Sequence, residues 1–280
     1  MRPLFFIGNK RSGTSKLVHY LNQHPEVFVT NESDVAWFLY QIEEGVDTEL
    51  AKRDEAEMEA QYSIRPFARH PYDIGSAGGV HTMRALRNTT VLSDPMSVRA
   101  RYEAILHAYM LSIRNGDTKS PYGPIIQRTL TDNVPWSRLA YIGDKMPTQN
   151  ADPQIFDWIW KRMPDAKFVH IVRDPHMVVS SMQRLGFNTW WREDTAQVLA
   201  TWTKIEEWVV RAEKTTTVLH VRQEDLVADV NREMGRIWDY LDIAPGPVYP
   251  DQRRHRAASQ PATLHPNDRT LAIMERYGYV

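Results

Sequence analysis

The fold of this chain can be inferred from one stretch near its beginning, Phe5-Phe6-Ile7-Gly8-Asn9-Lys10-Arg11-Ser12-Gly13-Thr14-Ser15-Lys16-Leu17-Val18. Apolar residues at 4–7 predict a short buried strand, and Leu17, Val18 and Leu21 have the spacing of the inward face of a helix. Between them lies a glycine-rich turn with cations and hydroxyl side chains. The N–H groups of such a turn point inward at a helix N-terminus, where the helix dipole favours negative charge. The stretch therefore predicts a cradle for phosphate or sulfate; the alternative is an ordinary strand, turn and helix with exposed basic residues.

The turn has the glycine spacing of the phosphate-binding loop of nucleoside triphosphatases, with Gly8 and Gly13 in the two glycine positions. Thr14 stands where that loop has a lysine, and the cations come earlier, at Lys10 and Arg11. Mg²⁺-dependent phosphoryl transfer relies on that lysine and on an acidic strand end that holds the metal. We therefore expect an anion cradle that works through arginine and lysine, without a metal.

Composition narrows the class of protein. A chain of 280 residues, of which 42% are apolar, fits one large α/β domain or two small ones and is ample for a packed core. The absence of cysteine excludes disulfides and thiol chemistry, and a net charge of −1 argues against a general nucleic-acid binder. No apolar run reaches the roughly 18 residues that a membrane span needs, and residues 1–30 lack the layout of a signal peptide. We expect a cytoplasmic protein that binds neither nucleic acid nor a membrane.

Short apolar runs alternate with helical segments along the chain, which predicts an α/β fold with a mostly parallel central sheet flanked by helices. The expected strands are 4–7, 27–29, 139–142, 168–172 and 218–221, and the expected helices are 47–62, 98–113, 152–163, 176–184, 194–213, 230–241 and 270–277. Residues 1–280 are expected to form a single domain, in which 45–135 is an insertion that roofs the acceptor site. Ligands of such sheets bind at the carboxyl ends of the strands. Arg11, Glu32, Lys145 and Arg173 all follow expected strands and could share this edge.

Two loops carry a resemblance to a known family. They are Lys10-Arg11-Ser12-Gly13-Thr14-Ser15 and Val172-Arg173-Asp174-Pro175, the latter with Ser181 eight residues after its arginine. This pair resembles the sulfotransferases that use 3′-phosphoadenosine 5′-phosphosulfate (PAPS). The segment 221–227, Val-Arg-Gln-Glu-Asp-Leu-Val, is similar to a late V-R-Y-E-D-L segment of that family, with Gln223 in place of tyrosine. The resemblance covers 3–30, 140–184 and 217–243, and implies a P-loop-like sulfotransferase fold with a helical insertion.

The resemblance implies roles for both loops. Arg11 matches the cation that neutralises the leaving phosphate, and Arg173 and Ser181 match the residues that bind the 3′-phosphate. For Arg173 alone, a salt bridge with Asp174 or with a neighbouring carboxylate is the alternative. The first loop would surround the 5′-phosphosulfate with the charges and hydrogen-bond donors of Lys10, Arg11, Ser12, Gly13, Thr14 and Ser15.

The acceptor hydroxyl needs a base, and the resemblance implies Glu32. Cytosolic small-molecule members have a histidine in the loop that here reads Asp144-Lys145-Met146-Pro147, which contains none. Tyrosylprotein and heparan-type members instead have a glutamate where this chain has Glu32. In this chain the neighbouring acid Asp34 is the substitute candidate for the base. Lys145 matches a lysine that would stabilise the sulfuryl group in transfer. The alternatives are a helix-capping acid for Glu32 and a surface cation for Lys145.

The expected function is transfer of a sulfuryl group from PAPS to a hydroxyl of a small-molecule or carbohydrate acceptor. The alternatives are a P-loop nucleoside-phosphate kinase and a non-catalytic nucleotide-binding protein. The histidines do not recur at metal-ligand spacing, and we expect His24, His81, His170 and His220 to be structural or exposed. The sequence leaves open the acceptor, the oligomeric state, and the roles of Trp190, Trp191 and the basic loop 253–256.

Overall fold

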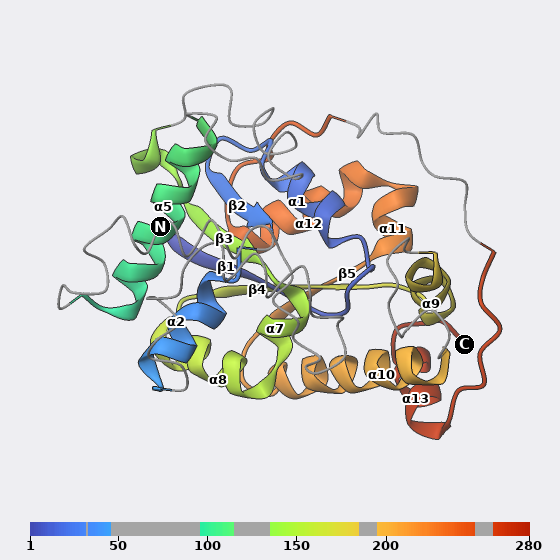
Figure 1. Ribbon diagram of the computed structural model, residues 1–280. Helices are drawn as coiled ribbons and strands as arrows, with labels where there is room; N and C mark the ends of the chain where they lie inside the picture. The colour runs from blue at the N-terminus through green and yellow to red at the C-terminus, as the bar shows by residue number, and fades with distance from the viewer. Residues whose placement is uncertain (32, 46–95, 115–134, 185–194, 250–259) are drawn as a thin grey trace.

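The computed structural model describes residues 1–31, 33–45, 96–114, 135–184, 195–249 and 260–280. Its centre is a five-stranded sheet in the order β2-β3-β1-β4-β5, in which every neighbouring pair is parallel (Figure 1). The strands are β1 (Arg2–Ile7), β2 (Val27–Asn31), β3 (Tyr141–Lys145), β4 (Lys167–Val172) and β5 (Val218–Arg222). The predicted α/β class with a parallel sheet is confirmed.

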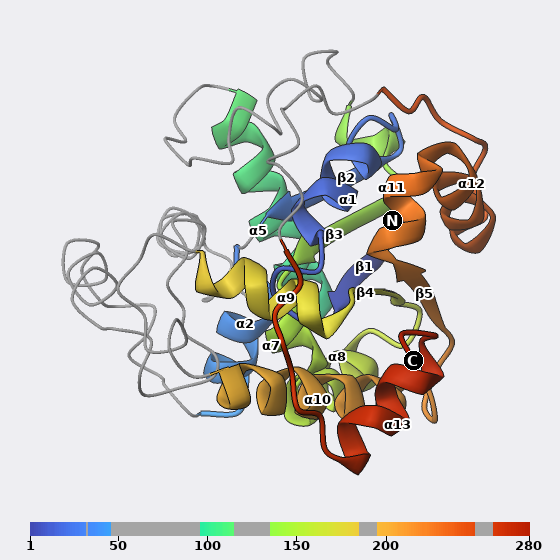
Figure 2. The ribbon, with the colours of Figure 1, turned by 90° about the vertical axis from the view of Figure 1, so that its right-hand side faces the viewer.

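Helices cover both faces of this sheet. Those described are α1 (Thr14–Leu21), α2 (Val35–Glu43), α5 (Val98–Arg114), the 3₁₀ turn η3 (Trp136–Arg138), α7 (Pro147–Ala151), α8 (Pro153–Arg162), α9 (Pro175–Gln183), α10 (Thr195–Ala212), α11 (Gln223–Ala228), α12 (Val230–Leu241) and α13 (Asp268–Arg276). Figure 2 shows the segment before α13 crossing α9, and the backbone N–H of Ala262 donates to the carbonyl of His176 there. Within these described helices, none combines the length and apolarity that a membrane crossing requires.

The two faces of the sheet bury two separate sets of apolar side chains. Because successive residues of a strand point to opposite faces, Phe5 and Ile7 of β1 join the core beneath α2, α5, α8 and α10, whereas Leu4 and Phe6 join the core beneath α1 and α12. All four side chains are fully buried. The central strand is therefore held from both sides, and the turn that follows it starts from a rigid base.

The third strand differs from the expectation. It runs to Lys145 and thus includes Asp144 and Lys145, which sequence reasoning had placed in a loop. The carboxylate of Asp144 is buried but accepts hydrogen bonds from Thr30 Oγ1 and from the backbone N–H groups of Ser33 and Val35, each at 3.0 Å. An acid with such partners can stay in a strand, because its lone pairs are satisfied without water. The short helix α7 after it, which begins at a proline, was also not predicted.

The expected insertion is described only in part. Within 45–135, α5 contributes Tyr102, Ile105 and Leu106 to the same core as β1, and it packs on α2 and β3. The expected helix at 47–62 lies outside the described residues, as do 46–95 and 115–134 as a whole. The single-domain organisation and the roof over the acceptor site stay predictions.

Replacing Gly143 by alanine is expected to lower the free energy of unfolding by about 1–3 kcal/mol or more. A Cβ there would lie 2.3 Å from the carbonyl oxygen of Leu4, and this backbone atom is fixed by the β1–β3 pairing. Urea unfolding followed by circular dichroism measures the loss. The matched control is Gly235→Ala in α12, where a Cβ meets nothing within 4 Å and alanine is the better helix former. Equal stability of the two variants would contradict the steric argument.

Candidate anion-binding site

The turn after β1 depends on two glycines. Gly8 has φ 128° and Gly13 has φ 88°, values that favour glycine, and Arg11 between them is also left-handed at φ 69°. A Cβ on Gly8 would lie 2.8 Å from His170 Cδ2, and one on Gly13 would lie 2.8 Å from Gln223 Cγ. Side chains of β4 and α11 therefore pack closely against the two glycines, which restricts the backbone of the turn to one conformation.

The helix that follows the turn begins without a side-chain cap. Gly13 occupies the cap position of α1, and the first turn contains no acidic residue. Ser12 is fully buried, and its hydroxyl has no hydrogen-bond partner in the described part of the chain. A buried hydroxyl without a partner costs free energy, and uncapped N–H groups at a helix start favour an anion. These features fit a bound phosphate or sulfate group.

The remaining loop residues surround this position. Thr14 is buried at the first position of α1, while Lys10 and Ser15 are half-buried and Arg11 is exposed. The turn is supported from behind by α7: the N–H of Gly8 donates to the carbonyl of Pro147 at 3.1 Å.

The second loop leads from β4 into α9. Asp174 caps this helix by accepting from the N–H of His176 at 2.8 Å, and Pro175 takes the first helical position, where a missing N–H is harmless. Ser181 lies on the same helix and is 7% exposed. Arg173 donates from Nη1 to the carbonyl of Arg11 at 3.0 Å, so its described hydrogen bond goes to the first loop and not to Asp174.

The two loops are in direct contact. Besides the bond from Arg173, Arg11 donates from Nε to Ser181 Oγ at 3.1 Å. Residues that are 162 and 170 positions apart in sequence thus meet at one edge of the sheet. The side chain of Arg11 therefore lies against Ser181 of the second loop. The resemblance implies a different position, beside the leaving phosphate in the first loop.

Positive charge accumulates where the loops meet. Burial lowers the pKa of the Arg173 guanidinium, the nearby charges of Arg11 and Arg184 lower it further, and Glu224 opposes this effect. The Nε of Arg173 is buried and has no hydrogen-bond partner among the described residues. A bound dianion would relieve both the mutual repulsion and the missing hydrogen bond.

The expected base and its neighbouring lysine lie at the ends of adjacent strands. Glu32 itself lies outside the described residues, but Asn31 just before it is paired with Lys145 in the β2–β3 register. Lys145 is 2% exposed, which rules out a surface cation. Asp34, the expected substitute, is fully buried with a left-handed backbone at the start of α2.

Three residues that shape the site were not singled out from the sequence for this role. Asp144 holds the backbone on the far side of position 32 through its bonds to Ser33 and Val35. Gln223 lies against Gly13, and Asn9 ties the first loop to α10. The sequence signal for them was their position inside the motifs already quoted. Trp190, Trp191 and the basic loop 253–256 lie outside the described residues.

Comparison with known proteins identifies the family. The model of the sulfotransferase family matches residues 3–245 of the chain. The chain belongs to the sulfotransferase family. This family forms an enzyme class that uses PAPS. The match includes both candidate anion loops, 10–15 and 172–175, and all of the described sheet except the first residue of β1.

Solved sulfotransferase structures share the fold. The sulfotransferase domain of the olefin synthase from Synechococcus PCC 7002 is 19% identical, with a TM-score of 0.57 over 100% of this chain and 95% of that one. The sulfotransferase domain from the curacin biosynthetic pathway is 16% identical, with a TM-score of 0.53 over 100% of this chain and 99% of that one. A search of curated protein sequences gives no match.

Proposed function

We propose that this sulfotransferase moves a sulfuryl group from PAPS to a hydroxyl of a small-molecule or carbohydrate acceptor. The observation that carries the proposal is the contact between the two anion loops, in which Arg173 donates to the Arg11 carbonyl and Arg11 donates to Ser181. One nucleotide with phosphates at its 3′ and 5′ positions can engage both loops at once. A nucleotide with a single phosphate can satisfy only one of them.

The proposed PAPS site has two parts, one at each of the contacting loops. The turn from Lys10 to Ser15, with its uncapped helix start, takes the 5′-phosphosulfate. Arg173 and Ser181 take the 3′-phosphate, where the crowding of positive charge favours a dianion. The hydroxyl of Ser12, which has no partner among the described residues, supplies a further donor to the 5′ group.

The proposed reaction is a single in-line displacement. The acceptor oxygen forms a bond to sulfur while the bond between sulfur and the 5′-phosphate oxygen breaks, and adenosine 3′,5′-bisphosphate (PAP) leaves with that electron pair. The acceptor proton goes to the carboxylate of Glu32. Arg11 and Lys145 offset the negative charge that develops on the leaving phosphate and on the transferred group, an electrostatic effect that is often the largest contribution to catalysis.

With Glu32 as the base, the proposed site would resemble that of the tyrosylprotein and heparan-type members of the family. It is supported by the strand register, which sets the residue before Glu32 opposite the buried Lys145. It is also supported by the three hydrogen bonds that Asp144 accepts from residues on either side of position 32. These bonds fix the described residues that precede and follow the proposed base.

The direct test is binding and transfer with the purified chain. We expect PAP to bind more tightly than adenosine 5′-monophosphate, without added Mg²⁺, and radiolabelled sulfate to pass from PAPS to one member of a panel of hydroxyl compounds. Tight binding of PAP with no transfer to any acceptor would favour a nucleotide-binding protein. Mg²⁺-dependent turnover of ATP would favour a kinase and overturn the proposal.

Arg173→Ala tests the 3′ site separately. We expect a loss of PAP affinity of about tenfold to a hundredfold, because a charge-assisted bond to phosphate contributes roughly 1.5–3 kcal/mol, with little change for adenosine 5′-monophosphate. Isothermal titration calorimetry with both nucleotides measures the difference. Arg232→Ala is the matched control, since that arginine is exposed on the outer side of α12 and contacts Glu233. Equal losses for the two nucleotides would remove Arg173 from the 3′-phosphate.

A further inference from the structure

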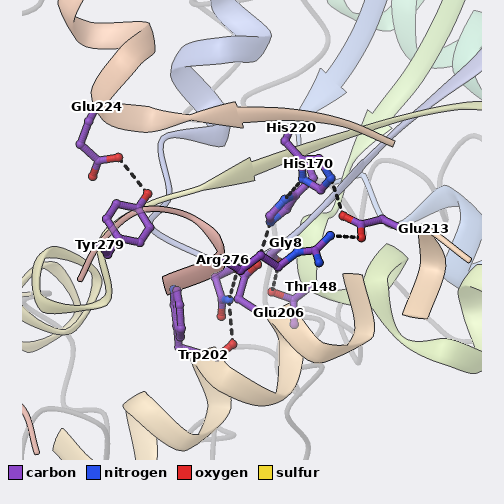
Figure 3. A network of polar contacts seen from close by, with 11 residues as sticks. Gly8, Thr148, His170, Trp202, Glu206, Glu213, His220, Glu224, Arg276 and Tyr279 are labelled. Carbon is purple, nitrogen blue, oxygen red and sulfur yellow. Dashed lines mark hydrogen bonds and ion pairs between the residues drawn. The ribbon is translucent and has the colours of Figure 1, made fainter. Parts of the chain in front are cut away.

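A chain of polar side chains, buried at its inner end, lies directly beneath the first anion loop (Figure 3). We call it the buried polar chain. It runs from the loop to the surface through Asn9, Glu206, His170, His220, Glu213 and Arg276. Glu206 and His170 are fully buried, and Asn9 is 4% exposed. The reaction proposed above uses none of these side chains, although buried ionisable groups are costly unless they serve a purpose or are well paired.

The first link fixes the anion loop to α10. The amide nitrogen of Asn9 donates to Glu206 Oε1 at 2.7 Å and to the carbonyl of Trp202 at 3.1 Å, so both of its hydrogens are used. Asn9 stands between Gly8 and Lys10, inside the loop. Since Gly8 also rests on the ring of His170, this part of the loop has its position set by the buried polar chain.

The next links constrain where protons lie. Glu206 Oε2 is 2.9 Å from His170 Nε2, and neither atom makes another hydrogen bond among the described residues. His170 Nδ1 is 2.8 Å from His220 Nδ1, and His220 Nε2 contacts Glu213 Oε1. Each contact joins two atoms that both accept unless one carries a proton. Three contacts therefore require three protons.

Counting these protons gives the net charge of the buried polar chain. Two neutral imidazoles supply two protons, so the buried polar chain must bind one more. With both carboxylates otherwise ionised, its charge is then −1, and Arg276 beside Glu213 offsets it. Burial, together with the charges of His170, Arg276 and Arg236, lowers the pKa of His220 to about 4, which disfavours a second additional proton.

We propose that the buried polar chain positions the first anion loop for the 5′ group of the donor. The one additional proton keeps all three contacts of the buried polar chain satisfied and thereby keeps the loop in this position. This inference rests on the proposed function for the identity of the ligand. Glu206 and His170 lie beneath the loop and act on it through Asn9 and Gly8, so they are positioning residues.

Other groups face the buried polar chain. Tyr277 follows α13, and its ring centroid lies 5.5 Å from that of His170 and 5.9 Å from that of His220. Glu206 and Glu213, after burial, raise the pKa of its phenol, so it stays neutral and adds no charge. Arg236 of α12 donates to the carbonyl of His220 at 3.2 Å. The two described cations near the buried polar chain, Arg236 and Arg276, thus lie at its surface end, beside His220 and Glu213.

The additional proton makes the loop sensitive to alkaline pH. In the unfolded chain both histidines are neutral well above their ordinary pKa of about 6.5, so unfolding releases the proton there. The folded state binds one proton more than the unfolded state, and its stability therefore falls as pH rises from about 7. Once the proton is lost, two lone pairs face each other across one contact and the support beneath Gly8 and Asn9 weakens.

Glu206→Gln separates the proton from the hydrogen bonds. A glutamine can accept from Asn9 through its oxygen and donate to His170 through its nitrogen, so all three contacts are satisfied without the additional proton. We expect PAP affinity near pH 7 within about threefold of wild type. As pH rises to about 9, wild type should lose stability relative to this variant with a slope of one proton, measured by urea unfolding. Parallel pH profiles of the two proteins would overturn the shared proton.

Asn9→Ala tests the positioning of the loop. We expect it to weaken PAP binding about tenfold and to leave adenosine 3′-monophosphate, which lacks the 5′ group, unchanged. Thr203→Val on the same helix is the matched control, because Thr203 is buried but bonds to Leu199 and Thr270, away from the loop. Retained binding of the 3′-monophosphate shows that the variant is folded.

The outcomes distinguish the inference from the proposed function. If wild type binds neither nucleotide, the proposed function fails. If wild type binds PAP but Asn9→Ala weakens both nucleotides equally or neither, or if Thr203→Val matches its selective loss, the positioning role is wrong while the function stands.

Discussion

Glu32→Gln is expected to lower kcat by about 10²–10⁴ while PAP binds as in wild type. Glutamine keeps the size of the side chain but cannot take the acceptor proton, so only the chemical step should suffer. The described residues after position 32 should keep their place, because Asp144 holds Ser33 and Val35 through their backbone N–H groups. Steady-state kinetics with the acceptor found by labelled transfer, together with calorimetric binding of PAP, measure both quantities.

Asp34→Asn is the control for this assignment. Asp34 is the other acid of the turn, and it is buried at the start of α2. If Asp34→Asn loses turnover and Glu32→Gln does not, the base is Asp34. If neither changes kcat, proton transfer to this turn is not part of the rate-limiting step, and the proposed mechanism fails at that point.

Arg11→Ala is expected to lower kcat by about 10²–10³ at saturating PAPS, the loss typical of removing one group that stabilises developing charge. The guanidinium lies against Ser181, 3.1 Å from its hydroxyl, so the catalytic role requires it to turn toward the 5′ group when the donor binds. The exposed position of Arg11 and its place at the junction of the two loops allow this movement without disturbing the core.

Kinetics with donor and acceptor varied separately decide between the two positions of this side chain. A loss confined to the KM for PAPS, with normal kcat, would show that Arg11 stays on the second loop and serves the 3′-phosphate. Arg11→Lys is the matched variant, since it keeps the charge but not the planar geometry of the guanidinium. Partial recovery of kcat in this variant would identify charge as the main contribution.

Local patterns in the sequence predicted most of the architecture. The alternation of apolar strands with amphipathic helices gave the parallel sheet, because each pattern reflects which face of an element is buried. The glycine spacing from Gly8 to Gly13 located the turn, since only a few residue types adopt its backbone conformation. Where the pattern was polar, as at Asp144 and Lys145, the strand end was misplaced, because their burial depends on partners far away in sequence.

The sequence by itself thus determined the class of fold, the positions of the two strand-to-helix loops and the family, each from residues close together in the chain. Only the tertiary structure decided that Arg11 reaches Ser181, that Lys145 is buried, and that His170 and His220 stand side by side in the β4–β5 register. Such contacts join residues whose separation in sequence is long, and the strand order that brings them together is set by the packing of the whole sheet. Propensity and spacing act over a few residues, whereas burial and the sharing of a proton depend on everything that surrounds a side chain.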